Sequence, residues 1–280
     1  MHATPNSRRV RRFLEALGCR PQGFIRRVCL AGLMVFAFAG GRLRAAGTNL
    51  TPTVPPPVQG ATLERLGRNF QEARVRLTAD PANATNAWLV GRASFELAEL
   101  TTNNPAKAEI AEQGIAACRQ AIARAPGLAP AHYYLGMTIG QLADTKRNMS
   151  ALKMVREMER EFIAARELDA PFDFAGADRN LGLLYHEAPS FISIGSRTKA
   201  RQHLKAAVEL APDFPENRLN LIETLLTWGD HEDARHELKA LEKHLPALKQ
   251  KFPGTPWIER PTDWQKRLEA AQKKTAALAK

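Results

Sequence analysis

Cysteine is scarce in this chain, with three residues among 280. Two of them, Cys19 and Cys29, lie near the N-terminus, and Cys118 alone lies beyond residue 46. A single cysteine cannot form an internal disulfide, so we expect the folded body to depend on side-chain packing. Cys118 lies in the small apolar segment GIAACRQAIA, which favours a buried small side chain over a reactive nucleophile.

Motifs for catalysis and metal binding are also missing. The sequence has no Gly-rich loop followed by Lys-Ser or Lys-Thr, no G-x-S-x-G, no H-E-x-x-H and no metal-type pair of cysteines. His231, His236 and His244 are five and eight residues apart, and a five-residue step turns about 500° around a helix, so the first two do not share a face. We expect no catalytic residue, no metal and no cofactor, and keep an enzyme of unknown type as an alternative.

The body of the chain lacks the positive charge that the total suggests. The formal net charge is +11, but residues 1–46 hold nine arginines and no lysine against the single acid Glu15. That segment carries +8, which leaves +3 for the remaining 234 residues. A nucleic-acid binder needs a sustained basic surface to displace counterions from phosphates, so we do not expect this protein to bind nucleic acid.

A long apolar run is missing too. The segment VCLAGLMVFAFAGG follows the arginines and precedes RLRAAG. It is shorter than the roughly 20 apolar residues of a membrane span, and its order of charged, apolar and small residues is typical of a secretory signal peptide. We therefore predict a signal peptide over 1–46, a mature chain beginning near Ala46 or Gly47, and a periplasmic or secreted protein. No cysteine stands directly after the run, so no lipid anchor is expected, and membrane contact is expected only through the leader.

The chain after the leader divides into a spacer and a helical body. Residues 47–60 include TNLTPTVPPPVQ, which is rich in proline and without charge, and predict an extended linker. From residue 61 to 280 the sequence shows helical spacing of Ala, Leu, Glu, Arg and Lys, with no alternating strand pattern. Breaks in this pattern are expected at Pro81, Pro105, Pro126, Pro171, Pro212, Pro246 and Pro261. The predicted fold class is all-α.

One spacing of small and apolar residues recurs along this body. In KARQHLKAAVELAPDF, Ala200, Leu204, Ala207 and Pro212 are separated by four, three and five residues. The same intervals return 34 residues later at Ala234, Leu238, Leu241 and Pro246, and earlier at Gly114, Cys118, Ala121 and Pro126. A fourth copy holds Phe162, Ala165 and Leu168, with Ala170 in the proline position. A first helix precedes each copy, marked by HYYLG, RNLGLLY and RLNLIETLL in the last three units.

These residues resemble the tetratricopeptide repeat (TPR), a pair of antiparallel helices of 34 residues. Leu181, Gly182 and Tyr185 match the pattern of the first helix, while in the first unit Trp88 and Phe95 fit and Arg92 takes the glycine position. The resemblance implies an α-solenoid of TPR-like helix pairs with lengthened helices or inserts, and a non-catalytic protein-binding function. Its expected repeats are about 84–126, 129–170, 175–212 and 215–246, followed by a capping helix at about 262–279.

A narrower resemblance concerns the T component of TRAP transporters, a periplasmic helical-repeat protein. It rests on ADRNLGLLY, AP and ARQHLKAAVELAPDF. It implies, as an alternative to a general envelope scaffold, an accessory role in solute transport with the solute-binding subunit as partner. Both alternatives make the partner another protein or a peptide.

The TPR resemblance also implies where a partner would bind. The first helices line a concave groove, and Tyr133, Met137, Arg179, Leu183, His186, Leu219 and Glu223 are its candidate binding residues. Arg179 and His186 are expected to contact a carboxylate or a peptide backbone, since the repeat does not need either for packing. Leu183 and Leu219 could instead pack on neighbouring repeats.

A six-residue insert in the third repeat supplies a second candidate surface. The segment HEAPSFISIGSRT places Phe191, Ile192 and Ile194 between a proline and a glycine, where the helical pattern does not need them. The loop could fold back and cover the core, because exposed apolar clusters are usually avoided. Alternatively it is an apolar interaction loop, since loops tolerate insertions and often carry recognition.

Overall fold

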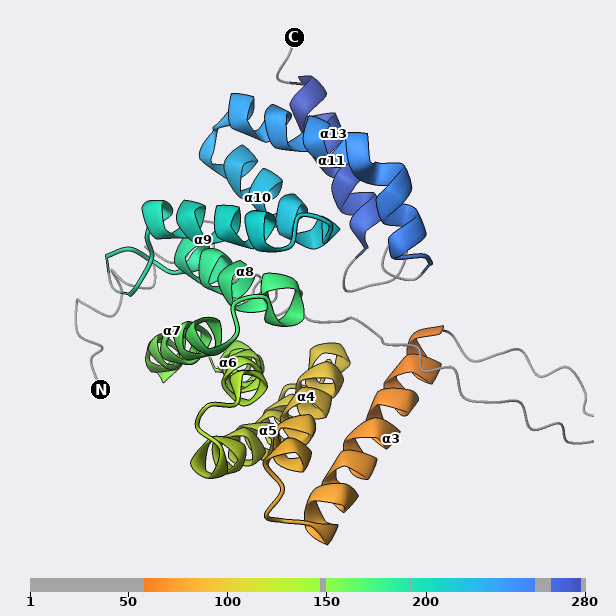
Figure 1. The fold of residues 1–280 in the computed structure, drawn as a ribbon, viewed down its shortest axis with the longest axis vertical. Coiled ribbons are helices and arrows are strands. Elements are labelled where there is room, and N and C mark those ends of the chain that lie inside the picture. The colour runs from red at the N-terminus through yellow and green to blue at the C-terminus, as the bar shows by residue number, and fades with distance from the viewer. Residues whose placement is uncertain (1–57, 147–149, 192, 255–262, 278–280) are drawn as a thin grey trace, which may run out of the picture.

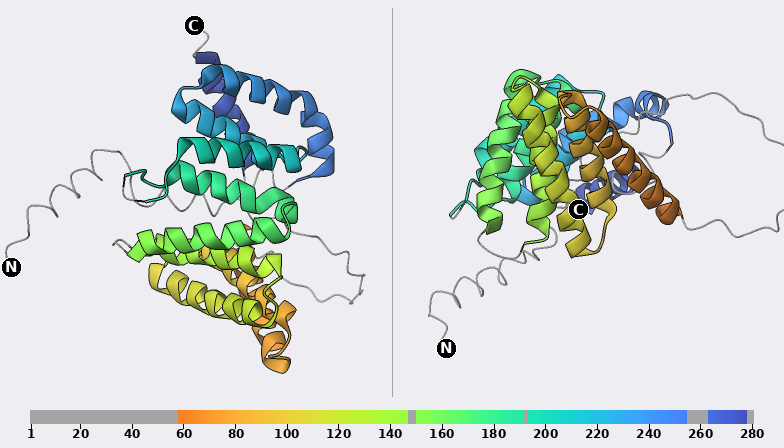
Figure 2. Two further views of the ribbon diagram at one scale, coloured as in Figure 1. Left: turned by 60° about the vertical axis from the view of Figure 1, so that its left-hand side comes forward. Right: turned by 90° about the horizontal axis from the view of Figure 1, so that it is seen from below.

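The computed structural model describes residues 58–146, 150–191, 193–254 and 263–277, and these ranges contain ten helices and no strand. The predicted signal peptide and all but the end of the predicted linker lie outside the described residues. The fold class is all-α, as the sequence predicts, and the helices stack in chain order into a solenoid (Figure 1, Figure 2).

Eight of the helices form four consecutive pairs. The pairs are α4 (Ala84–Leu100) with α5 (Asn104–Arg124), α6 (Ala129–Asp144) with α7 (Ser150–Leu168), α8 (Phe172–Glu187) with α9 (Arg197–Leu210), and α10 (Pro215–Trp228) with α11 (His231–Lys251). Helix α3 (Val58–Ala79) precedes them and packs on α4, and α13 (Trp264–Ala277) follows them and packs on α10. The first helices of the pairs, α4, α6, α8 and α10, contact one another in sequence and form the inner face of the solenoid.

Local sequence explains where several of these helices begin and end. Asn83 and Asn103 each accept hydrogen bonds from backbone amides of the following turn, which satisfies donors at the starts of α4 and α5. Pro105 lies in the first turn of α5, where a missing N–H is tolerated. Gly229 ends α10 at a φ of 79°, a left-handed conformation that favours glycine.

Glycine sets the distance between the two helices of a pair. A Cβ added at Gly182 would lie 2.6 Å from Leu204 Cγ, and one at Gly136 would lie 2.7 Å from the ring of Phe162. In the first pair the equivalent contact is made by Gly91, where a Cβ would lie 2.0 Å from the sulfur of Cys118. The predicted register of this unit is therefore corrected by one residue: Gly91 takes the glycine position instead of Arg92.

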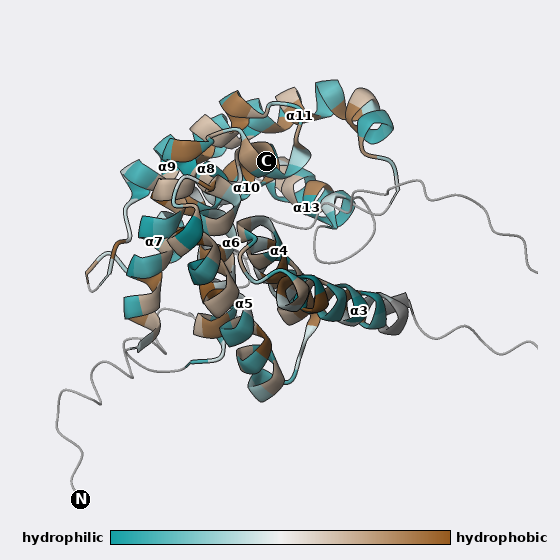
Figure 3. Ribbon diagram, turned by 60° about the horizontal axis from the view of Figure 1, so that its bottom comes forward, coloured by the Kyte–Doolittle hydropathy of each residue, from teal (hydrophilic) through white to brown (hydrophobic). Residues whose placement is uncertain are grey.

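The apolar core is continuous through the first three pairs and reaches α10. A second cluster joins α10, α11 and α13, and its members include Phe214, Leu219, Ile222, Leu241, Leu248, Phe252 and Trp264. Figure 3 shows apolar and polar residues mixed along the outer helices α5, α7 and α9, as expected for helices with one buried face.

Pro246 does not end its helix, contrary to the sequence prediction. Helix α11 continues through it to Lys251, although a proline inside a helix removes one backbone hydrogen bond and disfavours the helix by about 3 kcal/mol. Leu248 and Phe252, which follow Pro246, are buried in the second core cluster against Trp264. Burial of these side chains offsets the cost of continuing the helix.

Among the described residues, no helix combines the length and the apolar character needed to cross a membrane.

Candidate functional site: the inner face of the solenoid

The predicted groove residues all belong to the inner helices, but most of them are packed inside the protein. Tyr133, Met137, Arg179 and Leu219 are 0% exposed, and Leu183 is 4% exposed. His186 and Glu223 retain partial exposure. The TPR resemblance therefore places these residues on the inner helices, while the tight stacking of the helices leaves little of their surface open.

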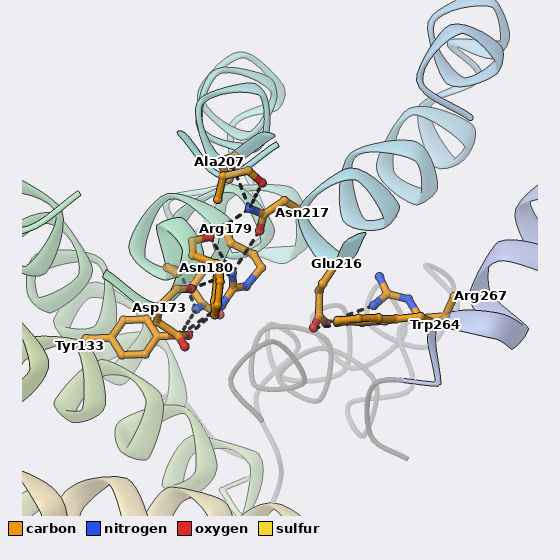
Figure 4. Close-up of polar contacts among 12 residues, drawn as sticks. Tyr133, Asp173, Arg179, Asn180, Ala207, Glu216, Asn217, Trp264 and Arg267 are labelled. Atoms are coloured by element: carbon orange, nitrogen blue, oxygen red, sulfur yellow. Dashed lines mark hydrogen bonds and ion pairs between the residues drawn. The ribbon is translucent and has the colours of Figure 1, made fainter. Parts of the chain in front are cut away.

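Arg179 forms hydrogen bonds, an ion pair and a cation–π contact inside the protein. Its Nη2 donates to Asp173 Oδ2 at 2.8 Å, and its Nη1 donates to Asn217 Oδ1 at 3.0 Å (Figure 4). Its guanidinium also lies over the ring of Phe214, 5.1 Å from the centroid. The expectation that packing does not need Arg179 is wrong. The carboxylate and the backbone carbonyls that it binds belong to its own chain.

Asp173 connects Arg179 to the preceding inner helix. The Tyr133 hydroxyl of α6 donates to Asp173 Oδ2 at 2.6 Å and accepts from Asn180 Nδ2 at 3.2 Å. Burial raises the pKa of Asp173, and the positive charge of Arg179 and the Tyr133 hydrogen bond oppose that rise. Burial, followed by the charge of Asp173, raises the pKa of Tyr133 well above its ordinary value. The phenol therefore stays protonated and acts as a structural donor.

The same network holds an unusual turn at the start of α8. Asp173, Phe174 and Ala175 have φ angles of 51°, 55° and 59°, a left-handed turn that costs roughly 1–2 kcal/mol per non-glycine residue. Arg179 Nη1 donates to the carbonyls of Asp173 and Phe174, both at 3.2 Å, and Asn217 Nδ2 donates to the Phe174 carbonyl at 2.9 Å. Buried side chains of α8 and α10 thus stabilise the strained backbone from inside.

A second polar network fastens α13 to the inner face of α10. Arg267 donates to Glu216 Oε1 at 3.1 Å and to both carboxylate oxygens of Glu223, at 2.9 and 3.0 Å. Trp264 Nε1 donates to Glu216 Oε2 at 3.4 Å (Figure 4). Burial raises the pKa of Glu216, and the charges of Arg267 and Arg179 oppose the rise. Glu223, a predicted groove residue, is therefore bound by the chain's own last described helix.

Several inner-helix residues carry buried polar atoms that have no hydrogen-bond partner among the described residues, and one of them is Asn180 of α8, through its Oδ1. Both carboxylate oxygens of Glu99, near the end of α4, are in this state, as is Nδ2 of Asn220 on α10. The Asn220 Oδ1 accepts from Arg267, which leaves its amide group as the unused donor. An orphaned acceptor and an orphaned donor on one face are unusual, because buried polar groups are normally paired.

Sequence reasoning did not single out Glu99, Asn220 or Arg267. The one-residue error in the first repeat hid Glu99, because it obscured the inward stripe of α4. For α10, a signal was present, because Glu216, Asn220 and Glu223 are four and three residues apart in the helix. That spacing places three polar side chains on one face. Nothing in the spacing indicated that Arg267 covers them.

The insert between α8 and α9 combines features of both predicted alternatives. Phe191 is 90% exposed, whereas Ile194 packs against the main core. Ile192 lies outside the described residues. The loop is fixed by a hydrogen bond of 2.9 Å from the Ser196 amide to the Tyr185 carbonyl. Ile194 therefore covers the core, and Phe191 is presented to solvent.

The cysteine and histidines considered for chemistry lie apart from one another. Cys118 is 0% exposed, and burial raises the pKa of its thiol. His236 and His244 are exposed on α11, and His231 is partly exposed at its start. Within the described ranges, no group of three or more His, Cys, Asp or Glu side chains is placed to hold a metal ion.

Known proteins share both the repeat sequence and the fold. Residues 195–247, which span α9, α10 and most of α11, match the tetratricopeptide repeat family. No curated protein matches the chain. A solved structure of a thermophilic TPR protein from Thermus thermophilus is similar, with 18% identity and a TM-score of 0.55 over 77% of this chain and 95% of that chain. At this identity the likeness concerns the fold. The chain thus carries a tetratricopeptide repeat sequence at 195–247 and folds as an all-α, TPR-like solenoid.

Proposed function

We propose that this protein is an exported, non-catalytic scaffold that binds a segment of another protein on the inner face of its solenoid. The observation that carries the proposal is that two polar groups on the inner helices, the Glu99 carboxylate and the Asn220 amide, are buried without a hydrogen-bond partner among the described residues. A peptide backbone and its side chains supply both donors and acceptors, so a bound segment can satisfy both groups at once. The tetratricopeptide repeat match over 195–247 supports a protein partner.

Site-specific crosslinking tests which face binds. A photoreactive phenylalanine analogue is placed at Glu223, which is partly exposed on the inner helix α10, and in a matched variant at Glu209, which is exposed on the outer helix α9. On irradiation in cells, we expect crosslinked products with another protein from position 223 and none from position 209. Equal products from both positions, or products from 209 alone, would contradict binding on the inner face.

Export is tested on the untagged full-length chain. We expect the protein in the periplasm or medium, with an N-terminus near Ala46 or Gly47 by mass spectrometry, because small residues follow the apolar run there. A chain that keeps Met1 and stays in the cytosol would contradict the proposal.

The accessory role in TRAP-type transport remains a prediction from short sequence segments alone. Its test is direct binding to a purified solute-binding subunit, and no residue contact in the structure favours it over a general scaffold.

A further inference from the structure

Glu99 has a buried carboxylate with no hydrogen-bond or ion-pair partner among the described residues. Burial raises its pKa well above the ordinary glutamate value, and the negative charges of Glu216 and Glu96 raise it further. Lys107 opposes these effects. A carboxyl group in this setting requires either a proton or a cation beside it.

Lys107, which acts on Glu99, and the cations paired with Glu96 and Glu216 are each bound to another acid. The contacts are Arg92 to Glu96 on α4 at 2.8 Å, Lys107 of α5 to Asp144 of α6 at 3.3 Å, and Arg267 of α13 to Glu216 of α10 at 3.1 Å. Glu99 is therefore the acid left over when these pairs are complete. The arrangement disfavours an anionic ligand at this position, since Glu96 and Glu216 already act on the same carboxylate.

Glu99 also lies on the inward stripe of its helix. Tyr133 and Arg179 each lie three residues before the close-approach glycine of their pair, and with Gly91 in that position the equivalent residue of α4 is Trp88. Glu99 follows eleven residues later, about three helical turns, and so shares its face. The residue as a whole is partly exposed although its two oxygens are not, so binding of a partner group there requires the side chain to turn towards solvent.

We infer that the inner face recognises a basic segment of its partner, with one lysine or arginine side chain forming an ion pair with Glu99. This inference rests on the proposed function, because it assigns a chemical class to the segment bound there. In the free protein the Glu99 carboxyl holds a proton. The incoming cation takes the place of that proton, which passes to the buffer, so the affinity for a basic segment rises as the pH rises.

A peptide library tests the inference on the full-length chain. The probe is a mixture of N-acetylated, C-amidated dodecapeptides with all residues equally represented, and retained peptides are identified by mass spectrometry. The comparison uses the parent, Glu99→Gln, and Glu112→Gln as the matched control, since Glu112 is exposed on the outer helix α5 of the same pair. We expect lysine and arginine to be enriched in peptides retained by the parent and the control, and not in those retained by Glu99→Gln.

Calorimetry then measures the ion pair itself. The most strongly retained basic peptide is compared with its analogue in which the critical lysine or arginine is glutamine, in buffers of different ionisation enthalpy at pH 7. We expect the analogue to bind at least about tenfold more weakly, as for loss of a charge-assisted hydrogen bond. We expect proton release with the basic peptide only.

The outcomes separate this inference from the proposed function. Peptides retained without basic enrichment, or basic enrichment that persists in Glu99→Gln, overturn the inference and leave peptide binding intact. Retention of no peptide by the parent overturns both.

Discussion

Arg179 shows how one side chain can hold three inner helices together. It binds Asp173 at the start of its own helix and Asn217 on α10, while Asp173 in turn accepts from Tyr133 on α6. Removing one partner of a buried ion pair leaves the other charge buried and uncompensated. The free-energy cost of that charge is larger than the stabilisation that the pair provides.

We predict that Arg179→Ala lowers the free energy of unfolding by about 3–5 kcal/mol, because Asp173 loses its buried partner and the left-handed turn loses two hydrogen bonds from Arg179 Nη1. Chemical denaturation measures the change. The control is Arg119→Ala, which removes an exposed pair with Glu157 and should cost no more than about 1 kcal/mol. Equal effects of the two substitutions would contradict the role given to Arg179.

A second prediction at the scale of a single residue concerns the effect of Glu99 on the pH dependence of stability. Its pKa in the folded state is raised, so its contribution favours the folded state below the pKa of the unfolded chain and is lost as the pH rises towards the folded pKa. Glu99→Gln removes this dependence. We expect the variant to melt at a higher temperature than the parent at pH 8, with the difference shrinking as the pH falls to 4. A difference that is constant across this range would argue that Glu99 is not buried.

Helix pairs are the next scale, and their spacing depends on small residues. Replacing Gly182 by leucine adds atoms in the space that Leu204 occupies. The first added carbon, Cβ, would lie 2.6 Å from Leu204 Cγ and 3.0 Å from the backbone nitrogen of Leu204. We expect a loss of about 1–3 kcal/mol from overpacking, and a lower melting temperature. The same substitution at Gly127, where an added Cβ meets nothing within 4 Å, is the control. Similar losses at both positions would contradict the helix contact described here.

The loop between α8 and α9 allows its two apolar residues to be separated. We predict that Ile194→Ser lowers the free energy of unfolding by about 1–2 kcal/mol, because Ile194 packs against the core. Phe191→Ser should leave melting unchanged, because its side chain already faces solvent. If Phe191→Ser instead lowers the melting temperature as much as Ile194→Ser, the loop acts only as a cover for the core.

At the scale of the whole molecule, the recurring spacing was enough to predict the fold class. The interval of four, three and five residues marks positions where helices cross, and those positions are set by packing geometry that the sequence records directly. The predicted helix break at Pro246 was wrong, because the effect of this proline on α11 depends on how deeply Leu248 and Phe252 are buried. Such burial is a property of the assembled stack.

The candidate site was predictable in location and not in detail. The TPR resemblance placed seven residues on the inner helices. It could not show that Arg179 is bound within an internal network, or that Glu99 has no partner among the described residues. Both facts depend on contacts between residues far apart in sequence, such as Tyr133 with Asp173 and Arg267 with Glu223. A pattern of period 34 contains no information about these pairs.

The polar network between Arg267 of α13 and the inner face of α10 limits where further helix pairs can be added to this solenoid. A further helix pair added after α11 would need the surface of α10 that α13 now covers, and would have to displace an arginine bound to two glutamates. A pair duplicated between α7 and α8, or between α9 and α10, would leave that closure untouched. Longer descendants of this protein, natural or engineered, should therefore carry their extra repeats in the interior of the chain, with the terminal α10–α13 unit inherited whole.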